Sequence, residues 1–318
     1  MANKSLINAK KAKNDEFFTQ LSDIEKELKH FKSHFKNKIV FCNCDNPIYS
    51  NFWRYFHLNF GLLKLKKLIT THYSKEIPSY KMEYSGGNDS DCNIGIKTPL
   101  IENGDFRSLE CVELLKQSDI VVTNPPFSLF REYVAQLVEN NKKFIIIGNI
   151  NAITYKEIFP LIKNNKLWSG YSFNKTFEFS VPDYYETSKS TRVDENNRKI
   201  VKVPSICWFT NCSIPKQQEQ LHLIERYSPE KYPKYDDYDA IEVSKVTNIP
   251  QDYDGLMGVP ITFLKKYNPK QFELVGEANH GSDNSFDLFK PTINRKLKFK
   301  RILIRNKKPM GAMISGSK

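Results

Sequence analysis

Hydrophobic side chains recur at three- and four-residue spacing over residues 15–36, a pattern that predicts a helix. The positions on its apolar face are Phe17, Leu21, Ile24, Leu28 and Phe31. A short apolar run at 39–41 predicts a strand, and an aromatic-rich helix candidate from Tyr49 to Phe60 follows Asp45-Asn46-Pro47. A second strand candidate spans 65–70, so we expect a β-α-β unit here.

The alternation of helices and strands resumes after a turn-rich segment at 74–104, which we expect to form a loop and a hairpin. Helices are predicted at 109–116 and 129–139, and strands at 119–123 and 144–150. Strands that alternate with helices are typical of a parallel sheet covered on both faces. The sequence therefore predicts an α/β fold with a mostly parallel sheet.

Beyond Trp168 the pattern changes to short strands in which polar and apolar side chains alternate. These strands, at 173–181 and 201–209, flank a polar link at 187–199 and are expected to add antiparallel hairpins at the sheet edge. Near the end of the chain, a basic strand candidate runs from Arg295 to Arg305.

A chain of 318 residues can bury one large core, or a catalytic domain with an appended region. We expect residues 1–165 to form the core and residues 166–318 to add the remaining strands, hairpins and a basic carboxyl-terminal region, all in one compact unit. No apolar run approaches the roughly 18 residues of a membrane span. The start lacks a secretory apolar segment and the six cysteines are irregularly spaced, so a soluble, cytoplasmic protein without membrane contact is expected.

The formal net charge of +12 is concentrated at one end of the chain. From Leu288 onward there are ten Lys or Arg residues and no Asp or Glu. A polyanion is the natural partner of such a surface, because each phosphate that a basic side chain neutralises releases a counterion. A solubilising tail is the alternative interpretation, and basic charge alone does not identify an enzyme.

The strongest local motif is Asn124-Pro125-Pro126-Phe127, which follows a β-branched strand. The two prolines supply no main-chain donors, so the turn offers mainly acceptors. The Asn124 side-chain oxygen and the Pro125 carbonyl can both accept from one planar NH2 group, while Phe127 can stack on the ring that carries it. Ligands also gather at the carboxyl ends of strands in open α/β sheets. Alternatively, the motif merely terminates a strand.

This loop resembles the Asn-Pro-Pro-aromatic hallmark of class I methyltransferases that act on planar amines. Three further segments, Asp15 to Gln20, Cys42 to Pro47 and Gly258 to Leu264, are similar to the EcoRI-type adenine-N6 DNA methyltransferases, and the similarity runs from about Lys13 to Arg305. The resemblance implies a class I, Rossmann-like sheet, S-adenosylmethionine as cofactor, and direct methyl transfer to N6 of an adenine flipped from duplex DNA. An RNA guanine-N2 methyltransferase and a non-catalytic nucleic-acid-binding protein remain alternatives.

The resemblance also assigns cofactor-binding residues, namely Phe17, Phe18, Thr19, Asn43, Asp45, Asp105 and Phe106. Asp45 would hold the cofactor's ammonium group, or else cap the following helix. Asp105 would accept from the cofactor's adenine amine, although Asp after Gly is also an ordinary turn residue. Two features depart from the pattern: the usual Gly-x-Gly is missing, and Thr70-Thr71-His72 lacks an acid for the ribose.

The remaining expectations concern metal ions and DNA. Cys42 and Cys44 have the wrong spacing for zinc, and we expect no metal. Phosphate contacts are expected from the two basic ends of the chain, at Lys10, Lys11, Lys13, Arg295, Lys296, Lys298, Lys300, Arg301 and Arg305. Base-reading residues are expected in the polar loops, including Arg192 and Arg198. One polypeptide is expected to act as a monomer, in some settings beside a separate restriction endonuclease.

Overall fold

The computed structural model describes residues 17–74, 79–182, 185, 191–195, 197–281 and 284–311. The chain forms two compact units, the first within residues 1–152 and 169–212, and the second within residues 153–168 and 213–318. These boundaries do not coincide with the expected division at residue 165, because residues 169–212 return to the first unit and supply strands of its sheet.

The first unit carries the larger sheet and most of the helices. Its elements, in chain order, are β1 (Phe18–Thr19), α2 (Leu21–Leu28), η1 (Lys32–His34), β2 (Ile39–Cys42), α3 (Asn51–Leu58), α4 (Phe60–Leu63), β3 (Lys67–Thr71), β4 (Tyr80–Tyr84), β5 (Ile96–Pro99), α5 (Leu109–Gln117), β6 (Ile120–Thr123), η2 (Phe127–Leu129), α6 (Phe130–Glu139), β7 (Lys143–Asn149), β9 (Lys175–Val181), β10 (Thr191–Val193) and β11 (Lys199–Thr210). Between β7 and β9 the chain forms η3 (Ile150–Thr154), α7 (Phe159–Lys163) and β8 (Trp168–Ser169).

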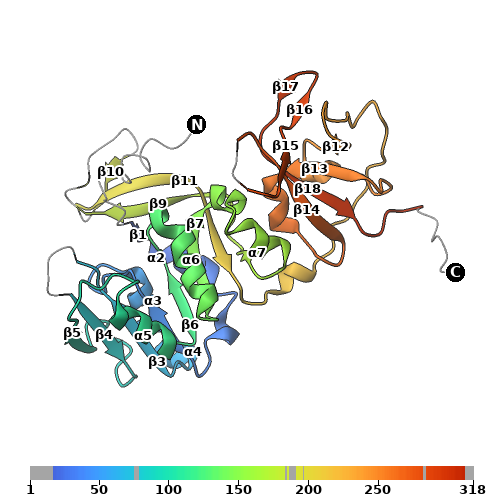
Figure 1. Ribbon diagram of the computed structural model, residues 1–318. Coiled ribbons are helices and arrows are strands. Elements are labelled where there is room, and N and C mark those ends of the chain that lie inside the picture. The colour runs from blue at the N-terminus through green and yellow to red at the C-terminus, as the bar shows by residue number, and fades with distance from the viewer. Residues whose placement is uncertain are drawn as a thin grey trace. The chain divides into compact units, whose positions relative to one another are not determined.

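The strands of the first unit follow the order β1-β9-β11-β7-β6-β2-β3-β4-β5, and β10 pairs with β11. The central strands β3, β2, β6 and β7 are parallel, whereas both sides of the sheet continue with antiparallel strands. In this part of Figure 1 the helices α3, α5 and α6 lie beside the sheet. The arrangement confirms the predicted α/β class, although the parallel strands are confined to the centre of the sheet and antiparallel strands extend it on both sides.

Burial explains why the sequences of the central strands are continuous runs of apolar residues. Every residue of β6 is buried, as are residues 144–148 of β7, because helices cover both faces of a parallel sheet. The helices present matching apolar stripes: α6 buries Phe130, Tyr133, Val134 and Leu137. Serine side chains cap two helices, with Ser50 at the start of α3 and Ser108 at the start of α5.

Two of the predicted helices begin at other residues than expected. The helix expected from residue 15 starts only at Leu21, because Phe18 and Thr19 pair with Ser180 and Phe179 as an edge strand. The helix expected at 49–60 is capped by Ser50, not started by the earlier proline, and Asn59 leaves helical geometry so that α3 and α4 are separate.

The second unit contains a smaller sheet in the order β12-β13-β18-β14-β15. Its elements after residue 213 are η4 (Pro215–Gln218), β12 (Ala240–Glu242), η5 (Val246–Asn248), β13 (Leu256–Pro260), η6 (Ile261–Lys266), β14 (Phe272–Ala278), β15 (Asp287–Phe289), β16 (Thr292–Ile293), β17 (Lys296–Leu297) and β18 (Arg301–Asn306). The single strand predicted at 295–305 is therefore wrong: β17 pairs with β16 in a two-stranded hairpin, and β18 joins the five-stranded sheet of the second unit. A turn with positive φ at Asn294 and Arg295 connects β16 to β17, and residues 298–300, which belong to no strand, separate β17 from β18.

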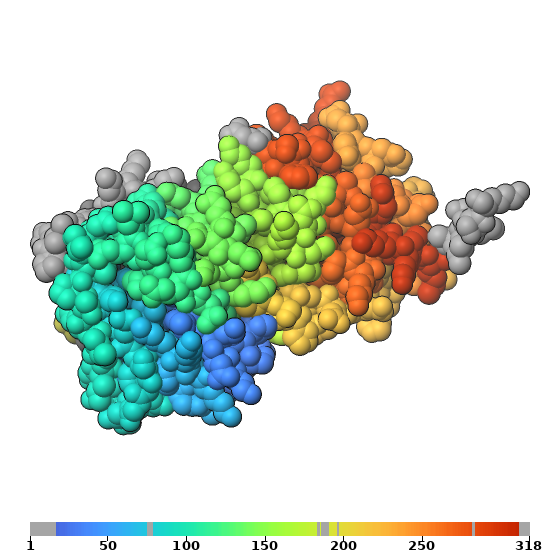
Figure 2. All heavy atoms as spheres, turned by 60° about the horizontal axis from the view of Figure 1, so that its bottom comes forward, coloured from blue at the N-terminus to red at the C-terminus, as the bar shows by residue number. Residues whose placement is uncertain are grey.

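The β4–β5 hairpin, predicted as part of a turn-rich segment, ends the main sheet with an exposed strand. Ile96 is 71% exposed, and Ile101 just beyond the strand is 86% exposed. Figure 2 shows this blue-green stretch of chain at the surface of the first unit. No helix in the described ranges is long and apolar enough to cross a membrane.

Candidate active site

The carboxyl ends of two neighbouring parallel strands, β2 and β6, form the centre of the candidate site. Residues 43–45 follow β2, and residues 124–127 follow β6. The hydroxyl of Thr123 donates to the main-chain carbonyl of Asn43, which ties the two strand ends together. The structure thus brings together the motif residues that the sequence placed after separate strands.

In the side-chain amide of Asn124, the nitrogen forms a hydrogen bond and the oxygen has no partner among the described residues. Its Nδ2 donates to the main-chain carbonyl of Phe17 at 2.6 Å. A carbonyl can only accept, so this contact determines which end of the amide faces Phe17. The Oδ1 atom is buried and has no hydrogen-bond partner among the described residues. The loop therefore holds a buried acceptor in a defined direction.

Aromatic rings surround the loop. Phe127 stacks on Phe17 with ring centres 6.0 Å apart and planes 18° from parallel, and it meets Phe179 edge-on at 6.4 Å. Phe17 also contacts Phe179 at 5.6 Å and Tyr185 at 5.9 Å. Phe17 is buried here and does not lie on a helix, so the interpretation as a helix face is wrong.

Sequence reasoning did not identify Phe179 or Tyr185 as part of this cluster. Phe179 lies on β9, which pairs with β1 and so carries its ring next to Phe17. The alternation of Phe177, Phe179 and Val181 predicted a strand, but no local pattern could show which strand it pairs with.

Asp45 is a buried carboxylate with no cationic partner among the described residues. It is 7% exposed and accepts a hydrogen bond from the Ser50 hydroxyl, which in turn caps α3 by accepting from the main-chain N–H groups of Phe52 and Trp53. Asp45 is therefore not the helix cap. Burial raises the pKa of Asp45 to about 8, against an ordinary value of 3.8. A buried acid of this kind is suited to a bound cation.

Asn43, close to Asp45 in the chain, is 1% exposed, and only one of its two side-chain amide atoms forms a hydrogen bond with a described residue. The Tyr133 hydroxyl, from α6, donates to its Oδ1, while its Nδ2 has no partner among the described residues. Burial raises the pKa of Tyr133 well above its usual value, so its hydroxyl stays protonated and remains a donor. Asn43 thus presents a buried donor near Asp45.

Gly104, which precedes Asp105 and Phe106, lies very close to the main chain of His72. Its φ is 76°, and a side chain at position 104 would overlap the carbonyl of His72. The Asp105 carboxylate accepts from Arg107 Nε at 2.8 Å and from Nη2 at 2.7 Å. This pairing lowers the pKa of Asp105. Phe106 is buried with its ring 5.1 Å from that of Tyr133. Each carboxylate oxygen of Asp105 thus accepts at least one hydrogen bond from Arg107.

Phe18 and Thr19 lie on β1. The Phe18 ring is half-buried and lies 5.8 Å from that of the exposed Tyr49. Thr19 is buried, and its main-chain carbonyl accepts from Asn51 Nδ2 at 2.7 Å. Because Asn51 begins α3, this bond joins β1 to the helix that follows the Asp45 loop.

The residues expected to contact DNA differ in their burial and in their ion pairs. Lys10, Lys11 and Lys13 lie outside the described residues. Arg192 pairs with Glu178 at 2.6 Å, and Arg198 pairs with Asp194 at 2.8 Å. Both arginines are exposed, but each already has a carboxylate partner.

Arg301 and Lys300, in the second unit, face inward. Arg301 is 8% exposed and its guanidinium lies 2.6 Å from the Glu242 carboxylate, which also accepts from the Tyr235 hydroxyl. Lys300 is half-buried and donates to the Thr154 hydroxyl at 2.9 Å. The burial of Arg301 does not fit the expectation of a DNA contact, because its charge is used inside the protein.

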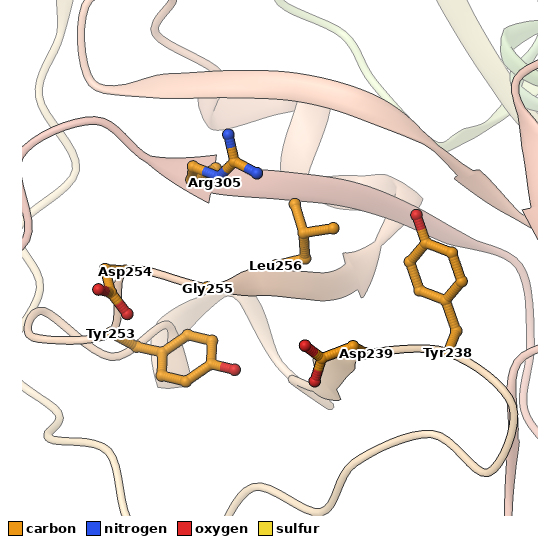
Figure 3. A pocket seen from close by; sticks show the side chains of 7 residues that line it. All are labelled: Tyr238, Asp239, Tyr253, Asp254, Gly255, Leu256 and Arg305. Atoms are coloured by element: carbon orange, nitrogen blue, oxygen red, sulfur yellow. The ribbon is translucent and has the colours of Figure 1, made fainter.

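Arg305 borders a pocket of about 320 Å³ in the second unit. The pocket is lined by Tyr238, Asp239, Tyr253, Asp254, Gly255, Leu256 and Arg305 (Figure 3). Two carboxylates in the lining make it unfavourable for a phosphate, and Arg305 also pairs with Glu273 at 3.4 Å. Arg295, Lys296 and Lys298 lie elsewhere, on the exposed β16–β17 hairpin.

Comparison with known proteins identifies the family to which these features belong. Residues 5–307 match the model of the family described as adenine-specific methyltransferase EcoRI. The chain belongs to this family. The resemblance seen in the sequence is thereby confirmed, and the chain is an adenine-specific DNA methyltransferase of the EcoRI family.

Individual relatives of this EcoRI-family chain cover most of its length. The chain is 46% identical to the Type II methyltransferase M.EcoRI of Escherichia coli, over 96% of this chain and 97% of that protein. It is 46% identical to M.MgeORF184P of Mycoplasma genitalium, over 84% of each chain, and 44% identical to M.MpnI of Mycoplasma pneumoniae, over 84% of this chain and 83% of that protein. No solved structure matches.

Proposed function

We propose that this EcoRI-family enzyme transfers a methyl group from S-adenosylmethionine to N6 of an adenine turned out of duplex DNA, with Asn124 to Phe127 as the catalytic loop. The observation that carries the proposal is the buried Asn124 Oδ1, which has no partner among the described residues while Nδ2 is held by Phe17. A buried acceptor without a donor is costly, so its presence at a strand end indicates a ligand that donates.

In this proposal, the N6 amine donates one hydrogen to Asn124 Oδ1 and the other to the Pro125 carbonyl. These two acceptors draw the nitrogen lone pair out of conjugation with the ring and aim it away from the loop. Phe127, held by Phe17 and Phe179, supplies a flat apolar surface for the base. With its lone pair exposed in this way, the amine would directly attack a methyl group supplied by the bound cofactor, and its surplus proton would then leave to solvent.

The residues after β2 fit the cofactor. S-adenosylmethionine supplies the electrophilic methyl group when bound. The buried Asp45 carboxylate, which has no cationic partner among the described residues, would hold an ammonium group, and Asn43 Nδ2 would donate to an oxygen beside it. Asp105 is already paired with Arg107, so we assign it no more than a supporting contact through an unused lone pair.

Replacement of Asn124 by alanine tests the proposal. Asn124→Ala should lower the rate of methyl transfer to duplex DNA by at least about a hundredfold, as loss of a preorganised hydrogen-bonding group does in other active sites. Tritium transfer from labelled cofactor would measure the rate, and calorimetry should show cofactor affinity within a few-fold of the wild type. Asn140→Ala is the matched control, because among the described residues that amide bonds only a carbonyl of its own helix.

Sequencing of DNA from cells that express the chain should reveal methylated adenines at one short site. Near-normal methylation by Asn124→Ala would overturn the role of the loop. Label transferred to ribosomal RNA, with none in duplex DNA, would overturn the substrate.

A further inference from the structure

The β16–β17 hairpin, defined here as residues 290–299, is held rigidly at its base. Thr292 pairs with Leu297 and Ile293 with Lys296. Ile293 is buried among Tyr235, Ala240 and Leu303 of the second unit. Figure 1 shows the hairpin extending away from the five-stranded sheet.

The tip of the hairpin is also fixed. Asn294 and Arg295 have φ of 50° and 62°, which is the backbone of a tight two-residue hairpin turn. The Asp236 carboxylate accepts from the main-chain N–H groups of both residues, each at 2.8 Å. A binding element that is already ordered loses little conformational entropy when a partner arrives.

Three lysines of the hairpin form no ion pair with a described carboxylate. Lys290 and Lys296 are exposed and Lys298 is half-exposed, and none of the three forms an ion pair with a described residue. By contrast, three basic residues that follow the hairpin are engaged: Lys300 with Thr154, Arg301 with Glu242 and Arg305 with Glu273. Between residues 290 and 305, the lysines that form neither an ion pair nor a side-chain hydrogen bond with a described residue therefore lie on the hairpin.

Two apolar side chains are exposed beside these lysines. Leu297 is 51% exposed and Phe299 is 87% exposed. Within β17, Lys296 and Leu297 point to opposite faces, and Lys298 and Phe299 follow directly after the strand. A large aromatic residue that remains exposed within a cationic surface indicates an interaction site more than a solvated loop.

We propose that the β16–β17 hairpin is a DNA-binding ribbon that enters the major groove, with Lys290, Lys296 and Lys298 on phosphates and Phe299 packed against the DNA. The proposal rests on the proposed function, since it assumes that the substrate is duplex DNA. A two-stranded ribbon matches the width of the major groove, and lysines beside it lie where the phosphate backbones border the groove. The charge complementarity selects a nucleic acid in preference to a second protein.

The lysine contacts are tested through the salt dependence of binding. The probe is a fluorescein-labelled duplex that contains the site methylated by the wild-type enzyme, and the dissociation constant is measured by anisotropy at several salt concentrations. Each lost phosphate contact lowers the slope of log affinity against log salt by about 0.9, so Lys296→Ala with Lys298→Ala should lower it by nearly 2. Lys245→Ala, an exposed lysine of the same unit, should leave the slope unchanged.

The aromatic contact is tested with Phe299→Ala. This variant should weaken binding roughly tenfold or more without changing the salt slope, because an apolar contact releases no counterions. Phe299→Tyr should restore most of the affinity. Ile224→Ala is the matched control, since Ile224 is 80% exposed in the same unit but lies outside the hairpin. A photoreactive phenylalanine analogue at position 299 should crosslink to the duplex, and one at 224 should not.

Failure of the hairpin proposal can be distinguished by experiment from failure of the proposed function. Wild-type affinity and slope in the lysine and Phe299 variants, with no crosslink from position 299, would overturn the hairpin proposal while methylation of DNA still proceeds. A wild-type enzyme that does not methylate duplex DNA would overturn the proposed function first. Loss of affinity in the variants, with normal cofactor binding and thermal stability, supports the ribbon.

Discussion

The side-chain amide of Asn124 donates to the main-chain carbonyl of Phe17, which lies 107 positions earlier in the chain. This bond fixes the direction of the Asn124 oxygen, and Phe17 also stacks on Phe127 of the same loop. Phe17 thus holds the loop through both a polar and an aromatic contact. The pairing of the adjacent strand β1 with β9 keeps Phe17 in place.

Asn124→Asp should make methylation depend on pH in a way that the wild type does not. A neutral carboxyl group can still donate to the Phe17 carbonyl and accept with its other oxygen, whereas a carboxylate would be repelled by that carbonyl. The pKa of the new acid is therefore raised, and activity should fall about tenfold per pH unit once the pH exceeds that pKa. Single-turnover rates from pH 5 to 9 would measure this, and a flat profile would contradict the role of the Phe17 contact.

Tyr133→Phe should destabilise the first unit. It removes the donor to Asn43 Oδ1 and leaves a buried acceptor unsatisfied, which costs about 1–3 kcal/mol. The free energy of unfolding in urea would measure the loss, and cofactor affinity should fall with it because Asn43 is no longer oriented. Tyr238→Phe is the control, since the Tyr238 ring stacks on Phe289 and no described residue bonds its hydroxyl. Equal stability of the two variants would count against this account.

Arg301→Ala should act on stability, not on the salt dependence of DNA binding. Removal of Arg301 leaves the Glu242 carboxylate buried without its cation, and loss of one partner of a buried pair costs about 3–5 kcal/mol. Unfolding in urea would show this loss, while the slope of log affinity against log salt should match the wild type. A reduced slope with unchanged stability would instead indicate that Arg301 contacts DNA.

The parts of the fold that depend on local sequence pattern could be predicted from the sequence. The apolar runs of β2, β6 and β7 predicted buried parallel strands, and the loop after β6 was evident because Asn-Pro-Pro-Phe follows a strand directly. Each of these signals lies within a few consecutive residues, where side-chain period and turn chemistry are visible.

Contacts between distant segments could not be predicted in the same way. The four-residue spacing of Phe17 and Leu21 suits a helix, yet Phe17 precedes β1, because a partner strand more than 150 positions away competes successfully for this segment. Likewise, Arg301 and Lys298 look equivalent in a basic segment. Only the position of Glu242, 59 residues earlier, decides that Arg301 is buried.

Burial raises the pKa of Asp45 to about 8 from an ordinary value of 3.8. A carboxyl group with a raised pKa holds its proton in the folded chain but not in the unfolded chain between these two values. The free energy of unfolding of the cofactor-free protein therefore includes a contribution that is full below about pH 4, falls as the pH rises, and is lost above about pH 8.

Asp45→Asn should abolish that fall, since an amide does not ionise but can still accept from Ser50. At pH 9 the variant should exceed the wild type by more than about 1.4 kcal/mol, the equivalent of one pKa unit, and the difference should vanish near pH 4. Urea unfolding at both pH values would measure it, with the exposed Asp237→Asn as control. Cofactor affinity should change in the opposite direction, because the variant lacks a charge for the ammonium group. In the wild type that affinity should rise about tenfold per pH unit between pH 6 and 7.5, as the carboxyl proton is released on binding. A variant that binds S-adenosylmethionine as tightly as the wild type would exclude Asp45 from the cofactor site.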